Sequence, residues 1–261
     1  MLLRYAKPVV KSVPILRTIL RPVYKSFTAK EPGDPCARRY CSLLPQLIPT
    51  PVFVKIGAND GTTGDPVSKI LLADQRWKGL LIEPVPYIFK RLTENFSDST
   101  RFSLEQAAIG KHSGEAPFYY VNPEAASHIP NLPYWHDQLG SFDRNHIIRQ
   151  LSVLEPFIIE ERVPVLTLDQ VFCKHEIKDV HLLHIDTEGY DHEVLKAVNL
   201  EKQPPMAIYI EHLNLARSDK AEMLRRLRKA GYRVDDCGCD YFAIHRTSSL
   251  RNLVDNMAIP K

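Results

Sequence analysis

The chain has 261 residues, of which 44% are hydrophobic and 25% are charged, and its formal net charge is +3. These values exclude wholesale disorder and a membrane-embedded helix bundle, and the length suits one large domain with a full core. No Lys/Arg tract interleaved with aromatic residues occurs, so the sequence predicts no nucleic-acid partner.

The first 50 residues differ from the rest of the chain. Residues 1–30 contain seven Lys or Arg and no Asp or Glu, and prolines interrupt their short apolar runs. They are therefore expected to form neither a signal peptide nor a membrane span, but a basic arm that is solvated, packed on the domain, or in weak contact with an anionic membrane surface as in a membrane-peripheral protein. Proline and glycine in residues 31–50 predict an irregular lead-in, so the main domain is expected at 51–261.

From residue 51 onwards, strand-like and helix-like patterns alternate, which predicts crossover units and a parallel sheet. Strands are expected at 52–56, 79–83, 102–109, 181–186 and 207–212, and helices at 66–73, 87–95, 190–198 and 218–230. Two final strands, 232–236 and 241–246, are joined only by the residues CGCD. So short a connection permits an antiparallel hairpin but no parallel crossover.

Residues 114–168 interrupt this rhythm. They are rich in aromatic, His, Asn and Pro residues and have a poor core pattern, apart from a strand-like run at 163–168. Long irregular segments in compact domains are often lids or binding loops, so a lid is expected here, with a plain surface insertion as the alternative.

The cysteines bear on the cellular compartment. Five of them, an odd number, occur without paired C-x-x-C spacing, which predicts free thiols and a reduced, cytoplasmic setting. A four-thiolate zinc site of unusual spacing is the alternative; it would use Cys36, Cys41, Cys237 and Cys239.

The stretch FVKIGANDG, at 53–61, is the first signal of a ligand site. Gly57 and Gly61 allow a tight strand-to-helix turn that presents backbone amides to a ligand with a nucleoside or anionic part. The next strand ends in GLLIEP and places Glu83 at the carboxyl edge of the sheet, where a carboxylate can accept hydrogen bonds from both hydroxyls of a ribose. A structural turn and a helix cap are the alternatives.

Six stretches occur in a fixed order: FVKIGANDG, LLIEP, LEQAAIG, QLGSF, LTLDQ and HIDTEGYDHEVLKA. As an ordered set they resemble the FkbM family of S-adenosylmethionine-dependent methyltransferases, over roughly residues 50–246. The resemblance implies a class I methyltransferase fold, Rossmann-like α/β with a mostly parallel seven-stranded sheet, and the antiparallel C-terminal hairpin agrees with it. The cofactor that it implies is S-adenosyl-L-methionine.

The resemblance also assigns residues to this cofactor. It places Glu83 on the ribose hydroxyls, Gln106 and Ala107 beside the adenine, and the turn residues around the methionyl and ribosyl parts; these are Gly57, Ala58, Asn59, Asp60 and Gly61. Position 55, often acidic or Gln in similar sequences, is Lys55 here. Because its charge would repel the ammonium and sulfonium groups, we expect its side chain to point away from the cofactor; the alternative is a weakened cofactor affinity, which would favour a non-catalytic protein of this fold.

Candidate catalytic residues follow the next two strands. Asp186 and Glu188 should face the cleft, with Asp186 also near the cofactor, because open parallel sheets bind ligands at this edge. Methyl transfer to a hydroxyl needs close alignment and removal of a proton, for which His212 is the candidate general base. Helix capping by the acids and a plain surface histidine are the alternatives. A divalent cation held by Asp186, Glu211 and His212 stays open, since the spacing does not decide it.

These features predict an O-methyltransferase that acts on a hydroxyl of a sugar, a saccharide or a related natural product. The acceptor is expected to meet side chains of the insertion that suit stacking and hydrogen bonding, namely Tyr134, Trp135, Ser141, Arg144 and His146. One alternative is a nicotinamide-dependent oxidoreductase, although that class ordinarily has a G-x-G-x-x-G turn. The other is a non-catalytic cofactor-binding or glycan-binding protein of the same fold.

Overall fold

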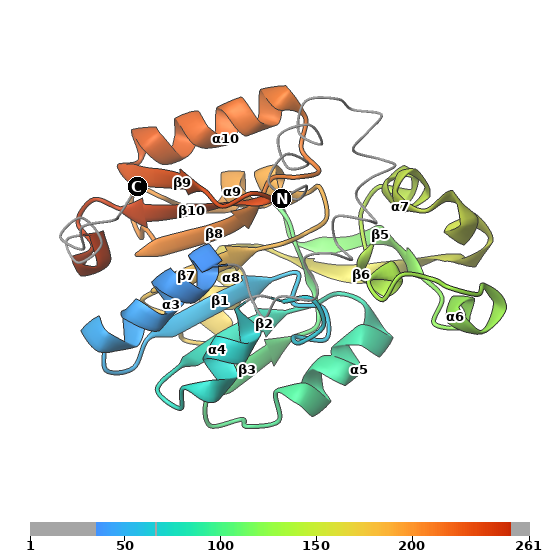
Figure 1. The fold of residues 1–261 in the computed structure, drawn as a ribbon, viewed down its shortest axis with the longest axis horizontal. Helices are drawn as coiled ribbons and strands as arrows, with labels where there is room; N and C mark the ends of the chain where they lie inside the picture. Colours follow the sequence, from blue (N-terminus) through green and yellow to red (C-terminus); the bar gives the residue numbers. More distant parts are fainter. Residues whose placement is uncertain (1–34, 66, 252–261) are drawn as a thin grey trace, which may run out of the picture.

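A computed structural model of the protein describes residues 35–65 and 67–251. Its centre is a seven-stranded sheet in the order β3-β2-β1-β7-β8-β10-β9 (Figure 1). The strands are β1 (Val52–Ile56), β2 (Lys78–Ile82), β3 (Phe102–Glu105), β7 (Leu182–Ile185), β8 (Ala207–Glu211), β9 (Tyr232–Asp236) and β10 (Asp240–His245). Neighbouring strands from β3 to β8 are parallel, whereas β10 is antiparallel to both β8 and β9. This is the class I methyltransferase topology, so the predicted fold class and C-terminal hairpin are confirmed.

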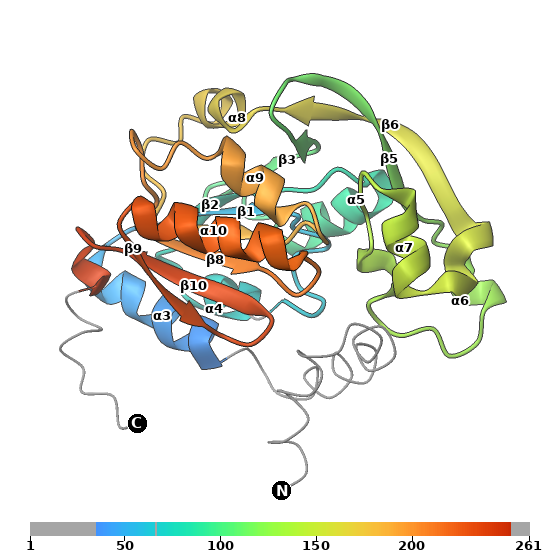
Figure 2. The ribbon, with the colours of Figure 1, turned by 90° about the horizontal axis from the view of Figure 1, so that it is seen from above.

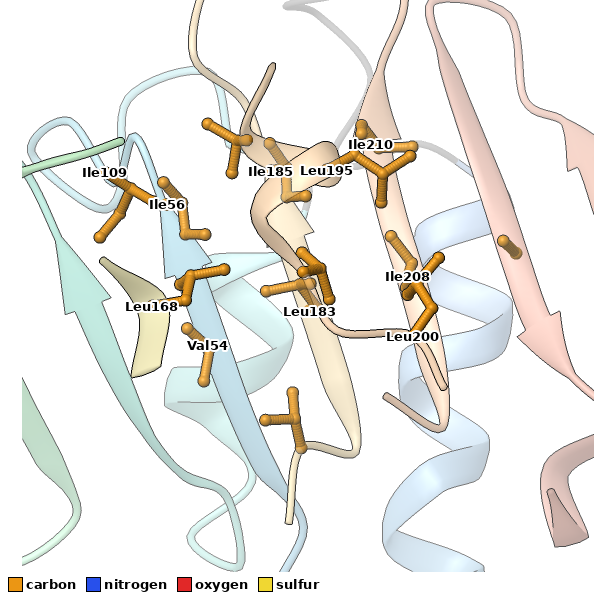
Figure 3. Close-up of a cluster of buried hydrophobic side chains, with 14 of the residues drawn as sticks. Val54, Ile56, Ile109, Leu168, Leu183, Ile185, Leu195, Leu200, Ile208 and Ile210 are labelled. Carbon is orange, nitrogen blue, oxygen red and sulfur yellow. The ribbon is translucent and has the colours of Figure 1, made fainter. Parts of the chain in front are cut away.

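Helices cover both faces of the sheet, which explains why its central strands are apolar on both sides. On one face, α8 (Leu168–Lys174), α9 (Asp191–Ala197) and α10 (Arg217–Lys229) pack on a cluster that includes Val54, Ile185 and Ile208 (Figure 3). On the other face lie α3 (Pro35–Leu47), α4 (Ser68–Ala73) and α5 (Pro86–Asn95), which pack on Phe53 and its neighbours (Figure 2).

Helix α3 corrects one prediction. Residues 31–50 are expected to be irregular, but 35–47 form a helix whose apolar side is buried against the sheet at Ala37, Tyr40, Cys41 and Leu44. The positions i, i+3, i+4 and i+7 make one helical stripe. Proline obscured this stripe in the sequence, although proline fits the first turn of a helix, and Pro45 lies near the end of this one. The domain therefore begins before residue 51.

The insertion is more regular than predicted. A second sheet, in the order β4-β6-β5, consists of β4 (Ala108–Ile109), β5 (Gly114–Val121) and β6 (Ile158–Leu166). The segment between β5 and β6 forms α6 (Ala125–His128), α7 (Arg144–Gln150) and the 3-10 turns η1 (His136–Gln138) and η2 (Ser152–Phe157). These elements bury a small core of their own around Trp135 and Ile147, to one side of the main sheet (Figure 1). The predicted strand 102–109 is divided at the exposed Gln106 between the two sheets.

The cysteines correct a second prediction. Cys41, Cys173 and Cys239 are free thiols, but Cys237 is disulfide-bonded. The expectation of free thiols is therefore wrong at Cys237, and the four-thiolate zinc alternative loses one of its ligands. Disulfides are rare in reducing compartments, so the cysteines no longer support a cytoplasmic location.

Membrane contact remains a prediction. Within the described ranges, no helix is both long enough and apolar enough to cross a bilayer. The basic arm at 1–30, which carries the prediction of surface contact, lies outside the described residues.

Candidate functional site

A cleft of about 590 Å³, its open mouth included, lies where the carboxyl ends of β1, β2 and β7 meet the insertion. This is the edge at which open parallel sheets bind ligands. The insertion supplies Phe118, Asp137, Gln138, Gly140, Ser141 and Phe142 to its lining. The rest of the chain supplies Ile56, Gly57, Asn59, Glu83, Pro84, Val85, Ala107, Ala108, Ile109, Asp186, Thr187, Glu188 and Tyr190.

The glycine turn after β1 forms part of this lining, but its amides do not face a ligand. Those of Gly57 and Ala58 both donate to the carbonyl of Ile82, at 3.1 and 2.9 Å. The amides of residues 59–63 donate to Glu83 or to acceptors within the turn itself. The prediction that the turn offers amides to an anionic group is therefore wrong, because the protein already uses every one of them.

The two glycines of this turn have different roles. A Cβ at Gly57, whose φ is +76°, would lie 1.9 Å from the carbonyl oxygen of Asp186, so glycine lets β1 and β7 end close together beside the cleft. A Cβ at Gly61 would lie 2.4 Å from the ring of Phe96 on the α5 side. Gly61 therefore fits the turn onto the core, and neither it nor its neighbours Ala58 and Asp60 line the cleft.

Glu83 follows β2 and is the best-defined polar group of the cleft. Its side chain is buried, Oε2 accepts the amide of Asn59 and Oε1 accepts the amide of Val85, both at 2.9 Å. Burial raises the pKa of Glu83 to about 7, and the two amides limit the shift. An ionised carboxylate has about four lone-pair sites, so each oxygen can accept one further hydrogen bond. That is the pattern expected of a partner for two ribose hydroxyls.

Lys55 lies next to the glycine turn but does not line the cleft. Its ammonium pairs with Asp65, and both side chains are only 4% exposed. The other carboxylate oxygen of Asp65 accepts the amides of Val67 and Ser68, which start α4. Burial lowers the pKa of Lys55 to about 8, and the charges of Asp186 and other carboxylates oppose this shift. Lys55 therefore has a partner away from the cleft, as the sequence predicts.

Four carboxylates converge where β7 and β8 end. Asp186 and Glu188 line the cleft, and Asn214 donates from Nδ2 to Oε2 of both Glu188 and Glu211 at 2.9 Å. Asp191 accepts the amides of residues 187 and 189, which holds the turn after β7, and its burial raises its pKa. Glu188 itself has a φ of +50°, an uncommon backbone conformation that is over-represented at functional sites.

A cation site is conceivable in this group. Oxygen atoms of Asp186, Asp191 and Glu211 lie within 4.8 Å of one another, and among the described residues this is the set that could bind a metal ion. Asp191 takes the place that the sequence suggests for His212. Three carboxylates match the oxygen ligands of Mg²⁺ or Ca²⁺, but acidic clusters also occur without any ion.

The remaining predicted catalytic residue, His212, lies outside the cleft lining. It is buried and stacks on Tyr241 with a ring distance of 3.8 Å, and its Nε2 lies 3.8 Å from Asp236. Of the predicted adenine residues, Ala107 lines the cleft and Gln106 is exposed.

The predicted acceptor residues are spread across the insertion. Ser141 lines the cleft, and His146 lies behind it, with Nε2 3.4 Å from Oε2 of Glu188. Trp135 is 1% exposed in the core of the insertion. Tyr134 is 41% exposed, and Arg144 pairs with Glu155 on the surface. The structure thus brings two of the five to the cleft or to the carboxylates at its edge.

Several cleft residues had no predicted role. Phe118 gave no signal because an aromatic residue in a strand usually belongs to a core, and Tyr190 lies within the ordered stretch HIDTEGYDHEVLKA but was given no role. Gln138, Gly140 and Phe142 lie within QLGSF, one of the ordered stretches, so the sequence marked this segment without indicating what it does.

The chain matches one known protein family and is similar to several solved structures. The family described as Methyltransferase FkbM domain matches residues 55–234. Curated protein sequences give no significant match. Solved structures with a similar fold include the Methanococcus jannaschii fibrillarin pre-rRNA processing protein, at 12% identity and a TM-score of 0.40, with 75% of this chain and 66% of that chain covered. Another is Aeropyrum pernix fibrillarin in complex with natively bound S-adenosyl-L-methionine, at 12% identity and a TM-score of 0.36, with 75% and 65% covered.

A third is the human methyltransferase 10 domain containing protein, at 12% identity and a TM-score of 0.39, with 82% of this chain and 83% of that chain covered. This chain spans just under two thirds of the length of the two fibrillarin chains.

Proposed function

The chain belongs to the FkbM family of methyltransferases, and from this membership we propose that it transfers a methyl group from S-adenosylmethionine to a hydroxyl oxygen of a sugar or a related natural product. The observation that carries the proposal is Glu83, a buried carboxylate at the carboxyl edge of β2 with one further acceptor position on each oxygen. Two neighbouring hydroxyls of a ribose match this arrangement.

The glycine turn favours this donor over a nicotinamide dinucleotide. Dinucleotide-binding turns hold a pyrophosphate with free backbone amides at a helix start. Here the amides of Gly57, Ala58 and the following turn residues all donate to acceptors of the protein. S-adenosylmethionine has no pyrophosphate, so a donor whose ribose is held by Glu83 needs no such pyrophosphate-binding turn.

The acidic end of the cleft suits the transfer step. Asp186 and Glu188 line it, so we assign proton removal from the acceptor hydroxyl to these carboxylates rather than to His212, which packs on Tyr241. Bound S-adenosylmethionine supplies an electrophilic methyl group on a sulfonium. The chain has to hold the hydroxyl in line with that methyl, accept its proton and exclude water.

The proposal that the acceptor is a sugar rests on the side chains at the acidic end of the cleft. The rings of Phe142 and Tyr190 line the cleft with centroids 4.9 Å apart, beside the hydroxyl of Ser141. An aromatic surface next to polar groups suits stacking on a sugar together with hydrogen bonding. A small saccharide is accordingly the proposed partner, without nucleic acid.

The test has two parts. Calorimetric titration with S-adenosylhomocysteine should show binding, whereas NAD should show none; the reverse result would favour the oxidoreductase. Methyl transfer from labelled S-adenosylmethionine should then be measured against a panel of glycans, with protein and RNA as comparison acceptors. Binding without turnover on any acceptor would favour a non-catalytic protein of this fold. Lys55 gives that alternative no support, because its charge is paired with Asp65.

A further inference from the structure

The cleft has two chemically different halves. Around Asp186 and Glu188 it is acidic, whereas its other half is apolar and is formed by Pro84, Val85, Ala107, Ala108, Ile109 and Phe118. Glu83 lies at the start of this apolar half, directly before Pro84 in the chain. A ligand whose sugar is held by Glu83 can therefore place an attached group in either direction, and only a flat apolar group suits the second.

Part of the apolar half belongs to the insertion. Phe118 is on β5. The segment 137–142 lies beside this strand, because Tyr119 and Ser141 exchange two backbone hydrogen bonds of 2.9 Å. Phe118 also meets the ring of Phe142 edge-on, with a centroid distance of 5.0 Å. The position of this wall is thus fixed by backbone pairing as well as by side-chain packing.

Two contacts tie the same segment to the main domain. Gln138 donates from Nε2 to the carbonyl of Thr63 at 2.6 Å, next to the glycine turn. Asp137 pairs with Arg91 of α5, also at 2.6 Å. The start of segment 137–142 is therefore anchored on the side of β1 and β2, while Phe142 at its end contacts Tyr190 next to the acidic edge.

The absence of a side chain at Gly140 lets segment 137–142 lie close to Phe118 and Val85 in the apolar half of the cleft. A Cβ at this position would lie 3.0 Å from Cε1 of Phe118 and 3.3 Å from Cγ2 of Val85, between one residue of the insertion and one of the main domain. Its backbone does not have positive φ, so the absence of a side chain, and not backbone conformation, is what glycine provides here. Any larger residue would displace the two side chains that bound the apolar half.

We infer that Phe118 and segment 137–142 of the insertion form the outer wall of the cofactor half of the cleft, and that Gly140 lets this segment pack closely on Phe118 and Val85, so that these two side chains keep the positions in which they bound the space for the adenine base. The inference rests on the proposed function, since it takes the ribose of the methyl donor to be held by Glu83. A purine has the flat aromatic shape that an apolar slot with an aromatic wall binds well. The insertion then acts on the donor as well as on the acceptor.

The experiment measures binding of S-adenosylhomocysteine to the full chain by calorimetry, in the wild type and in Gly140→Ala, Gly140→Val and Gly110→Ala. Gly110 is the matched control, because it also lacks positive φ and its Cβ would lie 2.6 Å from Val165, but it is not part of the cleft lining. We expect the dissociation constant to rise about fivefold in Gly140→Ala and more than about tenfold in Gly140→Val. Gly110→Ala should bind like the wild type, and adenosine should show the same ranking.

The outcomes separate this inference from the proposed function. A wild type that binds no S-adenosylhomocysteine overturns both. A wild type that binds it, with Gly140→Val binding equally well or changing only the Michaelis constant of the acceptor, overturns the adenine slot alone.

If Gly140→Val does not fold, Arg91→Ala is the second test, since Arg91 is outside the cleft and holds Asp137. It should release S-adenosylhomocysteine roughly two to five times faster, with Arg76→Ala, which loses a similar surface ion pair to Asp74, as its control. Equal release rates would overturn the inference.

Discussion

Replacing Glu83 by alanine should weaken the binding of S-adenosylhomocysteine by about 1–3 kcal/mol, which is roughly a fivefold to 150-fold rise in the dissociation constant. The estimate follows from the contacts of this carboxylate. Its two oxygens already accept the amides of Asn59 and Val85, so one acceptor position on each remains for a ribose hydroxyl. Alanine removes both, and it also leaves two amides without their partner, which lowers stability.

Calorimetry on the folded variant separates the two effects, and Glu105→Ala is the control. Glu105 ends the next strand, β3, and is also buried, but its carboxylate binds Lys174 and His175 and does not line the cleft. Its loss should lower the melting temperature without changing the affinity. An unchanged dissociation constant in Glu83→Ala, or an equal rise in both variants, would refute the assignment of Glu83 to the ribose.

The same carboxylate gives the binding a pH dependence. Because burial raises the pKa of Glu83 from 4.5 to about 7, the folded protein holds this proton more tightly than the unfolded chain, and the contribution of Glu83 to the unfolding free energy falls as pH rises between those values. Ribose hydroxyls favour the ionised form. Binding should therefore be tighter at about pH 8 than at about pH 6 and should release a proton near pH 6, which titrations in buffers of different ionisation enthalpy would detect. A flat profile would count against a carboxylate contact.

Three further predictions concern stability. Trp135→Ala should lower the free energy of unfolding by about 3–5 kcal/mol in urea denaturation, because the indole is buried in the core of the insertion; a change in acceptor kinetics alone would contradict this placement. Gly57→Ala should lower the free energy of unfolding far more than Gly64→Ala. Both glycines have φ near +75°, so both variants share a backbone strain of about 1–2 kcal/mol, but only at Gly57 does the new Cβ meet a backbone oxygen. Equal losses of stability in the two variants would contradict this role of Gly57. Lys55→Asp should cost about 3–5 kcal/mol without tightening cofactor binding, because it leaves Asp65 buried beside a second carboxylate; a stable variant would refute the buried pair.

Much of the fold could be predicted because its signals are local. The strands expected at 52–56 and 232–236 match β1 and β9, and the short CGCD link required the antiparallel hairpin. Helix α3 was missed because proline at both ends hid an apolar stripe that is visible only against the sheet. The regular structure of the insertion was missed for a related reason. Strands β5 and β6 pair over a separation of about 40 residues, and the residue pattern within a short window cannot indicate such a distant pairing.

The site divides in the same way. Glu83, Asp186 and Glu188 could be predicted because each follows an apolar strand, and strand ends of a parallel sheet meet at one edge. Trp135 and His212 were assigned from residue type alone, and the structure buries one in the insertion and stacks the other on Tyr241. Residue type indicates what a side chain can do, but its neighbours depend on packing.

The sequence by itself determined the alternation of strands and helices along the chain, the parallel sheet with its final hairpin, and the acids at its carboxyl edge, because strand length, apolar pattern and link length are properties of short stretches. Only the tertiary structure decided that the amides of the glycine turn are used internally, that Lys55 pairs with Asp65, and that segment 137–142 lines the cleft. The ion pair, the position of segment 137–142 and the contacts of the first turn amides with Ile82 and Glu83 all depend on groups that the folded chain brings together from different elements. Their distances follow from how two layers of helices and an inserted sheet pack, which no local pattern encodes.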